Sequence, residues 1–302
     1  MRGGNISHQE MAGSLLVLFA GVFWGTSGTA QAFAPSGASP FTVGAIRITG
    51  GGIFLFILLI FRKGLSWLKG GCPLKVLLPA SLGMAGFQFF FFVAIKMTGV
   101  AVGTMVAVGG APMWAGLLGY IIYKEPPEKM WYFSTSLAVI GCVLLSAGGE
   151  GLQTSLPGIF MAFSAAFSYA LCGMGLKGLR FLYGPIESAA LTLCGGSLFL
   201  LPLLFFFDVS WLTQWRGVGV ALHLGIVATA LPYSLFSMGI GIVPVAKAYT
   251  LTLTEPLTAC ILGVLLLGER LSFTSIAGIF FIFSGLALLS LKKKGEIKDN
   301  GG

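Results

Sequence analysis

Lys247 and the Glu255-Pro256 pair stand out because they lie inside an apolar stretch, residues 245–271, that is long enough to cross a bilayer. An ionised side chain at mid-membrane costs roughly 2.5–3.5 kcal/mol on insertion scales, so it normally faces a protein interior or an aqueous cavity. Pro256 lacks a backbone N–H and clashes with the preceding turn, which predicts a kink or break. On a helical wheel, Lys247, Glu255 and the four threonines of the stretch share one arc, so one side of the helix is expected to be wet.

A structural interpretation of the same residues stays open. The threonines can bond to carbonyl groups one turn back in their own helix, and Glu255 can join two helices as a buried strut. Lys247 lies near the end of the helix, so its side chain can also extend to the membrane interface.

Arg47 is a further charged residue within an apolar run, about two turns inside the segment that begins near Pro40. Because arginine keeps its proton, it needs a carboxylate, a carbonyl group or an anionic ligand, unless it extends outward to the interface. Gln88 is an amide in another apolar run, and a cavity could supply the partners it needs.

Four aromatic residues in apolar runs, Trp24, Trp114, Tyr169 and Tyr233, can line a slot for an apolar or cationic group. Packing is the simpler role for any one of them. Together with Arg47, Gln88, Lys247 and Glu255 they form the predicted substrate-binding set.

The composition identifies an integral membrane protein. The 302 residues are 56% hydrophobic and only 9% charged, whereas about 25% of the residues of a soluble domain are charged. The net charge of +8 is not gathered into a basic cluster, which argues against nucleic-acid binding. The five cysteines are scattered without metal-binding spacing and are expected to pack as small residues.

Catalytic motifs are nearly absent. The one G-x-G-x-x-G match, at residues 173–178, ends an apolar run and follows no strand, so it does not indicate nucleotide binding. Only His8 and His223 are present, which leaves no metal cluster and no convincing base for a nucleophile. We therefore expect no enzyme activity, no metal and no cofactor.

Hydropathy predicts an all-α membrane fold of ten transmembrane helices. The expected spans are residues 12–33, 40–61, 74–96, 100–123, 130–148, 156–176, 185–207, 217–240, 244–267 and 272–291.

Lysine and arginine sort to one side of these spans, which predicts that both termini are cytoplasmic. The outer loops hold only Lys96, Arg216 and Arg270. The inner loops and tails hold Arg2, Arg62, Lys63, Lys69, Lys75, Lys124, Lys129, Lys177, Arg180, Lys292, Lys293, Lys294 and Lys298.

The chain also repeats itself. Residues 99–149 align with 243–293 at an offset of 144, which matches Pro112 with Pro256, and the earlier spans align at an offset of 145, which matches Trp24 with Tyr169. This predicts a first repeat at residues 1–149 and a second at 150–302, the latter with a basic tail. Because each repeat has five spans, the second is inverted, an architecture common in transporters. Pro112 and Pro256 are the expected sites of helix interruption or gating.

Several motifs resemble the EamA family of the drug/metabolite transporter superfamily. They are Trp24-Gly25 in the first span, Pro112 in the fourth, and Glu255-Pro256 followed by residues 267–271, Leu-Gly-Glu-Arg-Leu. The resemblance covers essentially the whole chain and implies ten helices in two inverted repeats, a central cavity and alternating access. The first repeat departs from the pattern, since Lys124-Glu125-Pro126 replaces Gly-Glu-Arg.

We interpret the chain as a secondary transporter of the bacterial inner membrane that exports amino acids or similar small zwitterions. Arg47 or Lys247 would bind the carboxylate, and Glu255, Trp24 or Tyr169 the ammonium group. Glu255 is the candidate for proton coupling, because burial favours the neutral form of a carboxyl group. An exporter of hydrophobic cations or drugs, and a membrane sensor or scaffold without flux, are the alternatives.

Overall fold

The computed structural model describes residues 2–67, 71, 73–147, 155–268 and 272–290. In this part of the chain the regular structure is helical and includes no strand. A chain of apolar runs must satisfy its backbone polar groups within each segment when it lies in a membrane, and a helix does so. The predicted all-α fold is confirmed.

The elements follow the predicted spans closely. In chain order they are α1 (Arg2–Ala32), α2 (Pro40–Lys63), α3 (Leu74–Tyr123), α4 (Lys129–Ala147), α5 (Leu156–Arg180), α6 (Pro185–Leu200), the 3-10 helices η2 (Leu201–Phe205) and η3 (Ser210–Thr213), α7 (Trp215–Leu222), the π-helix η4 (His223–Ala230), α8 (Leu231–Ile240), α9 (Val245–Leu251), α10 (Thr254–Leu267) and α11 (Phe273–Ser290).

Within the described residues, 8 segments are long and apolar enough to cross a membrane, and two shorter apolar helices, Lys129–Leu144 and Phe273–Leu289, accompany them. Together they account for the ten predicted spans. Two of the spans are merged in α3, which kinks at Gly99 (φ 79°, ψ 165°). This conformation is accessible to glycine because it has no Cβ.

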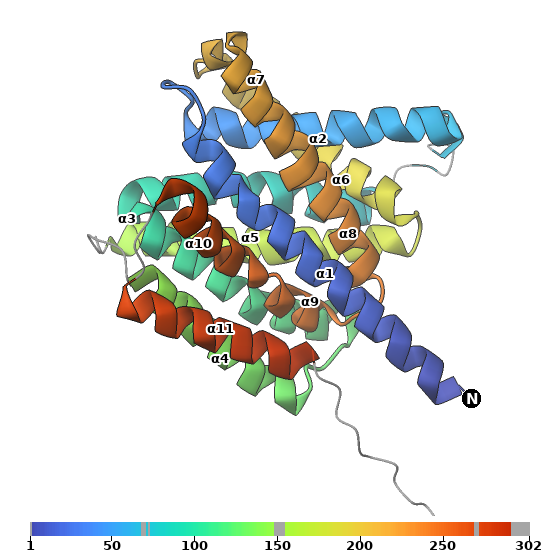
Figure 1. Cartoon of the computed structure of the whole chain (residues 1–302). Helices are drawn as coiled ribbons and strands as arrows, with labels where there is room; N and C mark the ends of the chain where they lie inside the picture. Colours follow the sequence, from blue (N-terminus) through green and yellow to red (C-terminus); the bar gives the residue numbers. More distant parts are fainter. Residues whose placement is uncertain (1, 68–70, 72, 148–154, 269–271, 291–302) are drawn as a thin grey trace, which may run out of the picture.

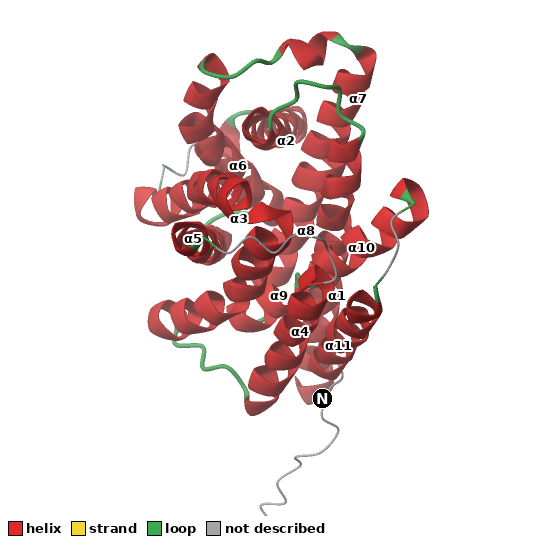
Figure 2. Ribbon diagram, turned by 90° about the vertical axis from the view of Figure 1, so that its left-hand side faces the viewer, coloured by secondary structure: helices red, strands yellow, loops and turns green. Residues whose placement is uncertain are grey.

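Helices of the predicted first and second repeats pack against one another. α1 packs against α8 and α10, and the matching helix of the second half, α5, packs against the long α3. α2 pairs with α6, and α4 pairs with α11. Figure 2 views α2, α3 and α5 nearly end-on and shows α4 beside α11.

Small residues allow these crossings. Gly141 of α4 lies against the backbone of α11 at Gly278 and Ile282, and Gly285 of α11 lies against the backbone of α4 at Ser134. A Cβ at either glycine would collide with the facing helix. Close backbone approach of this kind favours helix association in lipid, where apolar surface alone gives no driving force.

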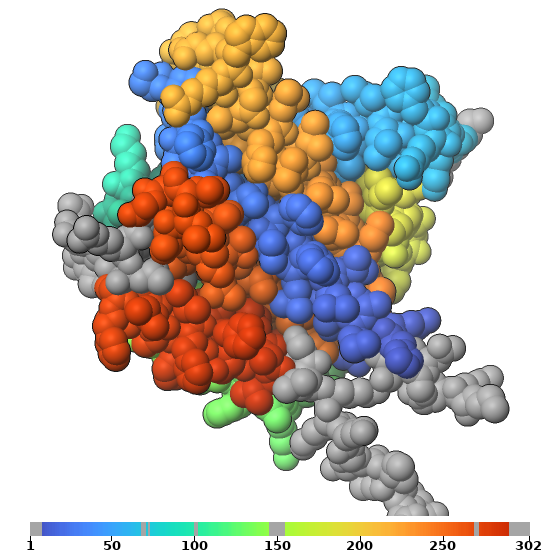
Figure 3. All heavy atoms as spheres, viewed as in Figure 1, coloured from blue at the N-terminus to red at the C-terminus, as the bar shows by residue number. Residues whose placement is uncertain are grey.

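One face of the bundle is covered by α1 together with the last helices of the chain. On this face, side chains of α1 fill the space between α10 and the segment of α7 and α8 (Figure 3). Trp24, the predicted binding residue on α1, is buried and packs against Tyr233 and Phe236 of α8.

Candidate functional site

The helix interruption predicted at Pro256 is found directly before it. α9 and α10 are separated by Thr252 and Leu253, which form a turn. The hydroxyl groups of Thr252 and Thr254 each donate to a carbonyl three residues back, at 2.8 and 3.0 Å. Thr254 also donates to the carbonyl of Leu18 in α1, at 3.1 Å. These hydroxyl groups stabilise the break by bonding to carbonyls near it.

The threonine side of this segment is a packed seam and not the wet surface that the helical wheel predicted. Thr250 is fully buried, and its hydroxyl oxygen accepts a hydrogen bond from the indole N–H of Trp131 in α4, at 3.0 Å. It also shares a hydrogen bond of 2.8 Å with Thr135. The alternative interpretation, in which the threonines satisfy protein groups, is the one that the structure supports.

No break occurs at Pro112, so this part of the prediction was wrong. α3 keeps helical dihedral angles through Pro112, and its one non-helical residue is Gly99. Proline removes a single N–H, and a helix packed among others tolerates that loss. Beside Pro112 stand alanine and methionine, which carry no hydroxyl to stabilise an open turn as the threonines do before Pro256.

Glu255 lies in the first turn of α10, immediately after the break. Its side chain is partly buried and makes no hydrogen bond or ion pair with the residues that the structure describes. It interacts electrostatically with Arg47 of α2 and with Tyr169 and Tyr233.

Arg47 is the second unpaired charge at this level of the bundle. It is partly buried, and its Nε atom is buried without a hydrogen-bond partner among the described residues. The described ion pairs do not include it. A guanidinium group cannot lose its proton to escape this environment, so it is well suited to hold an anionic ligand.

An aromatic cluster of Trp24, Tyr169, Tyr233, Phe236 and Tyr249 lies beside the two charges. The Trp24 ring centroid is 5.1 Å from that of Tyr233, 5.4 Å from Phe236 and 6.3 Å from Tyr169. Tyr169 is 4.8 Å from Tyr249, whose hydroxyl donates to the Tyr169 carbonyl at 2.5 Å. All five are buried, and the indole N–H of Trp24 has no described partner.

Of the other predicted binding residues, Gln88 and Lys247 have polar partners, whereas Trp114 has ring contacts and a buried indole N–H without a described partner. Gln88 is buried and donates to the Gly44 carbonyl at 3.2 Å, which joins α3 to α2. Lys247 forms an ion pair with Glu10 of α1 at 2.8 Å, so it does not pair with Glu255. Trp114 packs edge-on against two phenylalanines of α5, at 5.5 and 5.1 Å.

Two hollows on the bundle surface lie away from the charges. A hollow of about 500 Å³ between α3 and α4 is lined mainly by Met113, Leu117, Tyr120 and Tyr132, which are exposed. A smaller one, of about 390 Å³, contains Trp114. The residues that line them include neither Arg47 nor Glu255.

The arrangement can bind charged groups but offers little for catalysis. Arg47 and Glu255 interact electrostatically, form none of the described ion pairs, and interact with Tyr233 of the aromatic cluster. In the described residues no group of three or more His, Cys, Asp or Glu side chains could hold a metal ion. Cys142, Cys172 and Cys194 are free thiols.

Sequence reasoning missed Phe236 and Tyr249 in the aromatic cluster. Tyr249 lies outside the polar arc of its helix, so the wheel gave it no role. Phe236 follows Tyr233 by three residues, a spacing that places both side chains on one helix face. The helical spacing between Tyr233 and Phe236 could therefore have predicted that Phe236 belongs to the aromatic cluster.

Comparisons with known proteins agree with this architecture. The model of the EamA-like transporter family matches residues 11–147 and 156–291. The uncharacterized transporter YwfM of Bacillus subtilis is 39% identical over 277 residues, with 92% of this chain and 93% of that protein covered. A probable amino-acid metabolite efflux pump of Salmonella typhimurium is 26% identical, with 76% of this chain and 81% of that protein covered. A solved crystal structure with 21% identity has a TM-score of 0.79 and covers 92% of this chain and 98% of its own, a likeness of fold alone.

Proposed function

Because the chain belongs to the EamA-like transporter family, we propose that it exports amino acids or similar small zwitterions from the cell by alternating access. One relative with a functional name, the probable amino-acid metabolite efflux pump, is consistent with this substrate class. We propose no catalytic activity.

The unpaired charges of Arg47 and Glu255 are the observation that carries the proposal. They lie on α2 and α10, interact electrostatically, and have no other ion-pair partner in the described chain. A zwitterion would satisfy both at once, with its carboxylate at Arg47 and its ammonium group at Glu255. Both charges would otherwise remain poorly compensated within the membrane.

The aromatic cluster supports the same substrate class. The unpartnered indole N–H of Trp24 is a donor for a carboxylate oxygen. The faces of Tyr169 and Tyr233 offer a surface for an ammonium group or for the apolar part of a side chain. Gln88, Trp114 and Lys247 have structural partners and are left out of the proposed site.

Transport must be driven by a gradient, because the sequence contains no nucleotide-binding motif. Glu255 is the proposed proton-coupling residue, since it is the carboxyl group next to the site. We further propose that the protein lies in the inner (plasma) membrane with both termini cytoplasmic. The excess of lysine and arginine in the predicted inner loops supports this orientation.

Counterflow in proteoliposomes tests the proposal. Vesicles preloaded with single unlabelled amino acids would be assayed for uptake of the same radiolabelled compound at two internal pH values, with protein-free vesicles as the control. Exchange confined to a few amino acids is the expected result. If no zwitterion exchanged, the proposed substrate class would be wrong.

Export of hydrophobic cations is the second candidate, and Glu255 beside five aromatic rings is the observation that favours it. Such a substrate has no group for Arg47 to bind. Arg47→Ala should therefore abolish exchange of a zwitterion but spare exchange of a cation, so the two candidates are separated by one variant.

A further inference from the structure

Three ion pairs lie at one end of the bundle, the end that holds the N-terminal part of α1 and the C-terminal end of α2 (Figure 1). The ion pairs among the described residues are Lys63–Glu187, Lys177–Glu125 and Lys247–Glu10. Each joins one residue of the predicted first repeat, 1–149, to one of the predicted second repeat, 150–302. We call them the inter-repeat ion pairs.

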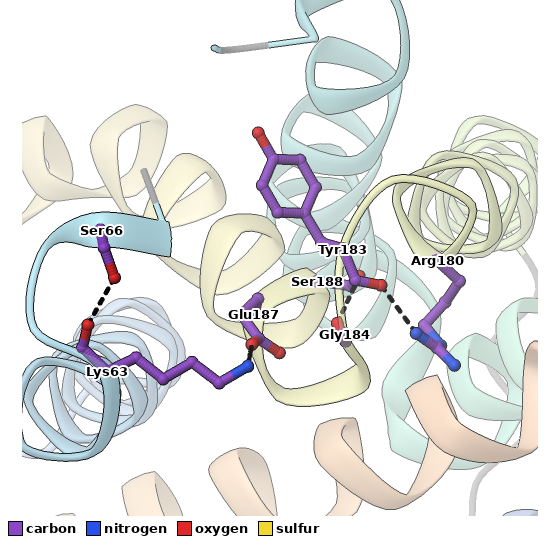
Figure 4. A network of polar contacts seen from close by, with 7 residues as sticks. All are labelled: Lys63, Ser66, Arg180, Tyr183, Gly184, Glu187 and Ser188. Atoms are coloured by element: carbon purple, nitrogen blue, oxygen red, sulfur yellow. Dashed lines mark hydrogen bonds and ion pairs between the residues drawn. The ribbon is translucent and has the colours of Figure 1, made fainter. Parts of the chain in front are cut away.

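Lys63 and Glu187 join the end of α2 to the start of α6 (Figure 4). The carboxylate is almost fully buried, with 6% of the side chain exposed, whereas 55% of Lys63 is exposed. Arg180 holds the neighbouring turn by donating to the carbonyls of Tyr183 at 2.7 Å and Ser237 at 3.0 Å. Arg180 therefore holds the turn that precedes Glu187.

Glu125 makes the most extensive of the three connections. One carboxylate oxygen accepts from the Lys177 ammonium at 2.5 Å, and the other accepts from the backbone N–H of Val245, the first residue of α9, at 3.2 Å. Lys177 is buried, donates to the Val243 carbonyl at 3.4 Å, and lies 5.5 Å from the centroid of the Tyr123 ring. A residue of the first repeat thus holds two helices of the second.

The short helix α9 connects these ion pairs to the proposed substrate site. Glu125 holds its N-terminus, and Lys247 on α9 pairs with Glu10 of α1. Tyr249 of α9 belongs to the aromatic cluster, and the chain then passes through the break to Glu255. The break separates α9 from α10, so α9 can move without carrying the whole span with it.

At the positions that the repeat offsets match to these residues, the opposite end of the bundle carries no pair of opposite charges. The two repeat offsets assign each inter-repeat ion-pair residue a counterpart in the other half. For each pair, at least one of these counterparts carries no charge, so an ion pair cannot form. The counterparts are Ala32 and Glu269, Thr42 and Asp208, and Gly103 and Ser155. Glu269 lies outside the described residues.

We propose that the inter-repeat ion pairs are a latch that closes the cytoplasmic end of the transporter and must open before substrate can load. This inference rests on the proposed function for its orientation and for the direction of loading. At the outer end the described residues form no ion pair between the repeats, and Arg216 instead donates to the Phe33 carbonyl at 2.7 Å. Movement of α9 transmits the state of the Arg47–Glu255 site to the latch.

The test uses Cys172, which lies on α5 between Tyr169 and Lys177 and is buried. The full chain, with its other four cysteines replaced, would be placed in right-side-out and inside-out vesicles. A membrane-impermeant maleimide then reports access to Cys172 from each side. We expect Glu125→Gln to speed labelling from the cytoplasmic side by about tenfold, as a tenfold population shift would.

Glu128→Gln is the matched control, because Glu128 is an exposed glutamate of the same loop that forms none of the described ion pairs. It should leave labelling unchanged. Lys63→Glu should also speed labelling, and adding Glu187→Lys should slow it again, which tests the latch even if Glu125→Gln fails to fold.

The latch would be wrong if Glu125→Gln and Lys63→Glu labelled no faster than Glu128→Gln, or if labelling rose only from the outer side. This readout needs no substrate. If the variants behaved as expected while no amino acid exchanged in counterflow, the latch would stand and the proposed substrate class would fail.

Discussion

Basic and acidic side chains occur both at the proposed substrate site and in the inter-repeat ion pairs, but only those of the inter-repeat ion pairs are bonded to each other. Arg47 and Glu255 lie deep among the helices without hydrogen-bonded partners in the described chain, whereas Glu125, Lys177 and Glu187 have partners within 3.5 Å. Paired charges hold elements together, and unpaired ones are available to a ligand. The difference separates a closing contact from a binding site.

Arg47→Ala should have the largest effect on transport. Losing the charged contact to a substrate carboxylate costs about 2–5 kcal/mol, or a fall of at least about thirtyfold in zwitterion exchange. Arg47→Lys should keep part of the activity, and initial rates of counterflow measure both. An equal loss of zwitterion exchange in Lys63→Ala would contradict the proposal that Arg47 binds substrate and Lys63 belongs to the latch.

Glu255→Gln should have the next largest effect. Glutamine preserves the shape of the side chain but can neither bind an ammonium group by charge nor exchange a proton. We expect exchange to fall by about tenfold, as loss of one charge-assisted hydrogen bond predicts, and its dependence on internal pH to disappear. If the pH dependence persisted unchanged, proton coupling through Glu255 would be wrong.

Breaking the latch should affect stability more than binding. Glu125→Ala leaves the buried Lys177 without its partner, so it should lower the free energy of unfolding by about 3 kcal/mol. Lys63→Ala leaves the nearly buried Glu187 carboxylate without its partner and should cost a similar amount. Thermal unfolding in detergent measures both, with Glu128→Ala as the control. If Glu125→Ala and Glu128→Ala lowered the free energy of unfolding by similar amounts, the ion pair of Glu125 would not stabilise the closed latch.

The two prolines should have the smallest effects, and unequal ones. Pro256→Ala would allow α9 and α10 to form one continuous helix through Thr252 and Leu253. We expect this to slow exchange by about threefold, which corresponds to less than about 1 kcal/mol in the activation barrier. Pro112→Ala should change little, because α3 is already helical there. Rates from the same counterflow assay compare them, and equal effects would show that the break does not matter to transport.

The fold could be predicted from the sequence because its signals are local or periodic. Apolar length predicted the ten spans, and Pro256 itself predicted the helix break that lies directly before it. The same logic failed at Pro112, because a proline opens a helix only where neighbouring side chains can satisfy the freed carbonyls. Both sites have the proline, but only one has the threonines.

The candidate site was predictable only in part, since a residue type does not reveal its partner. Arg47, Glu255, Trp24, Tyr169 and Tyr233 come together as anticipated. Lys247 belonged to the same sequence pattern, yet it pairs with Glu10, which is 237 positions away. Such long-range pairing depends on how helices pack, and a single sequence does not specify it.

Ligand-induced stabilisation of the purified protein tests whether it binds amino acids through Arg47. Thermal unfolding would be followed with and without amino acids, in the wild type and in Arg47→Ala, because a ligand that binds the folded state raises its stability. If Arg47 binds the substrate carboxylate, a few amino acids should stabilise the wild type and not the variant. Equal stabilisation of both, or stabilisation by hydrophobic cations alone, would contradict it.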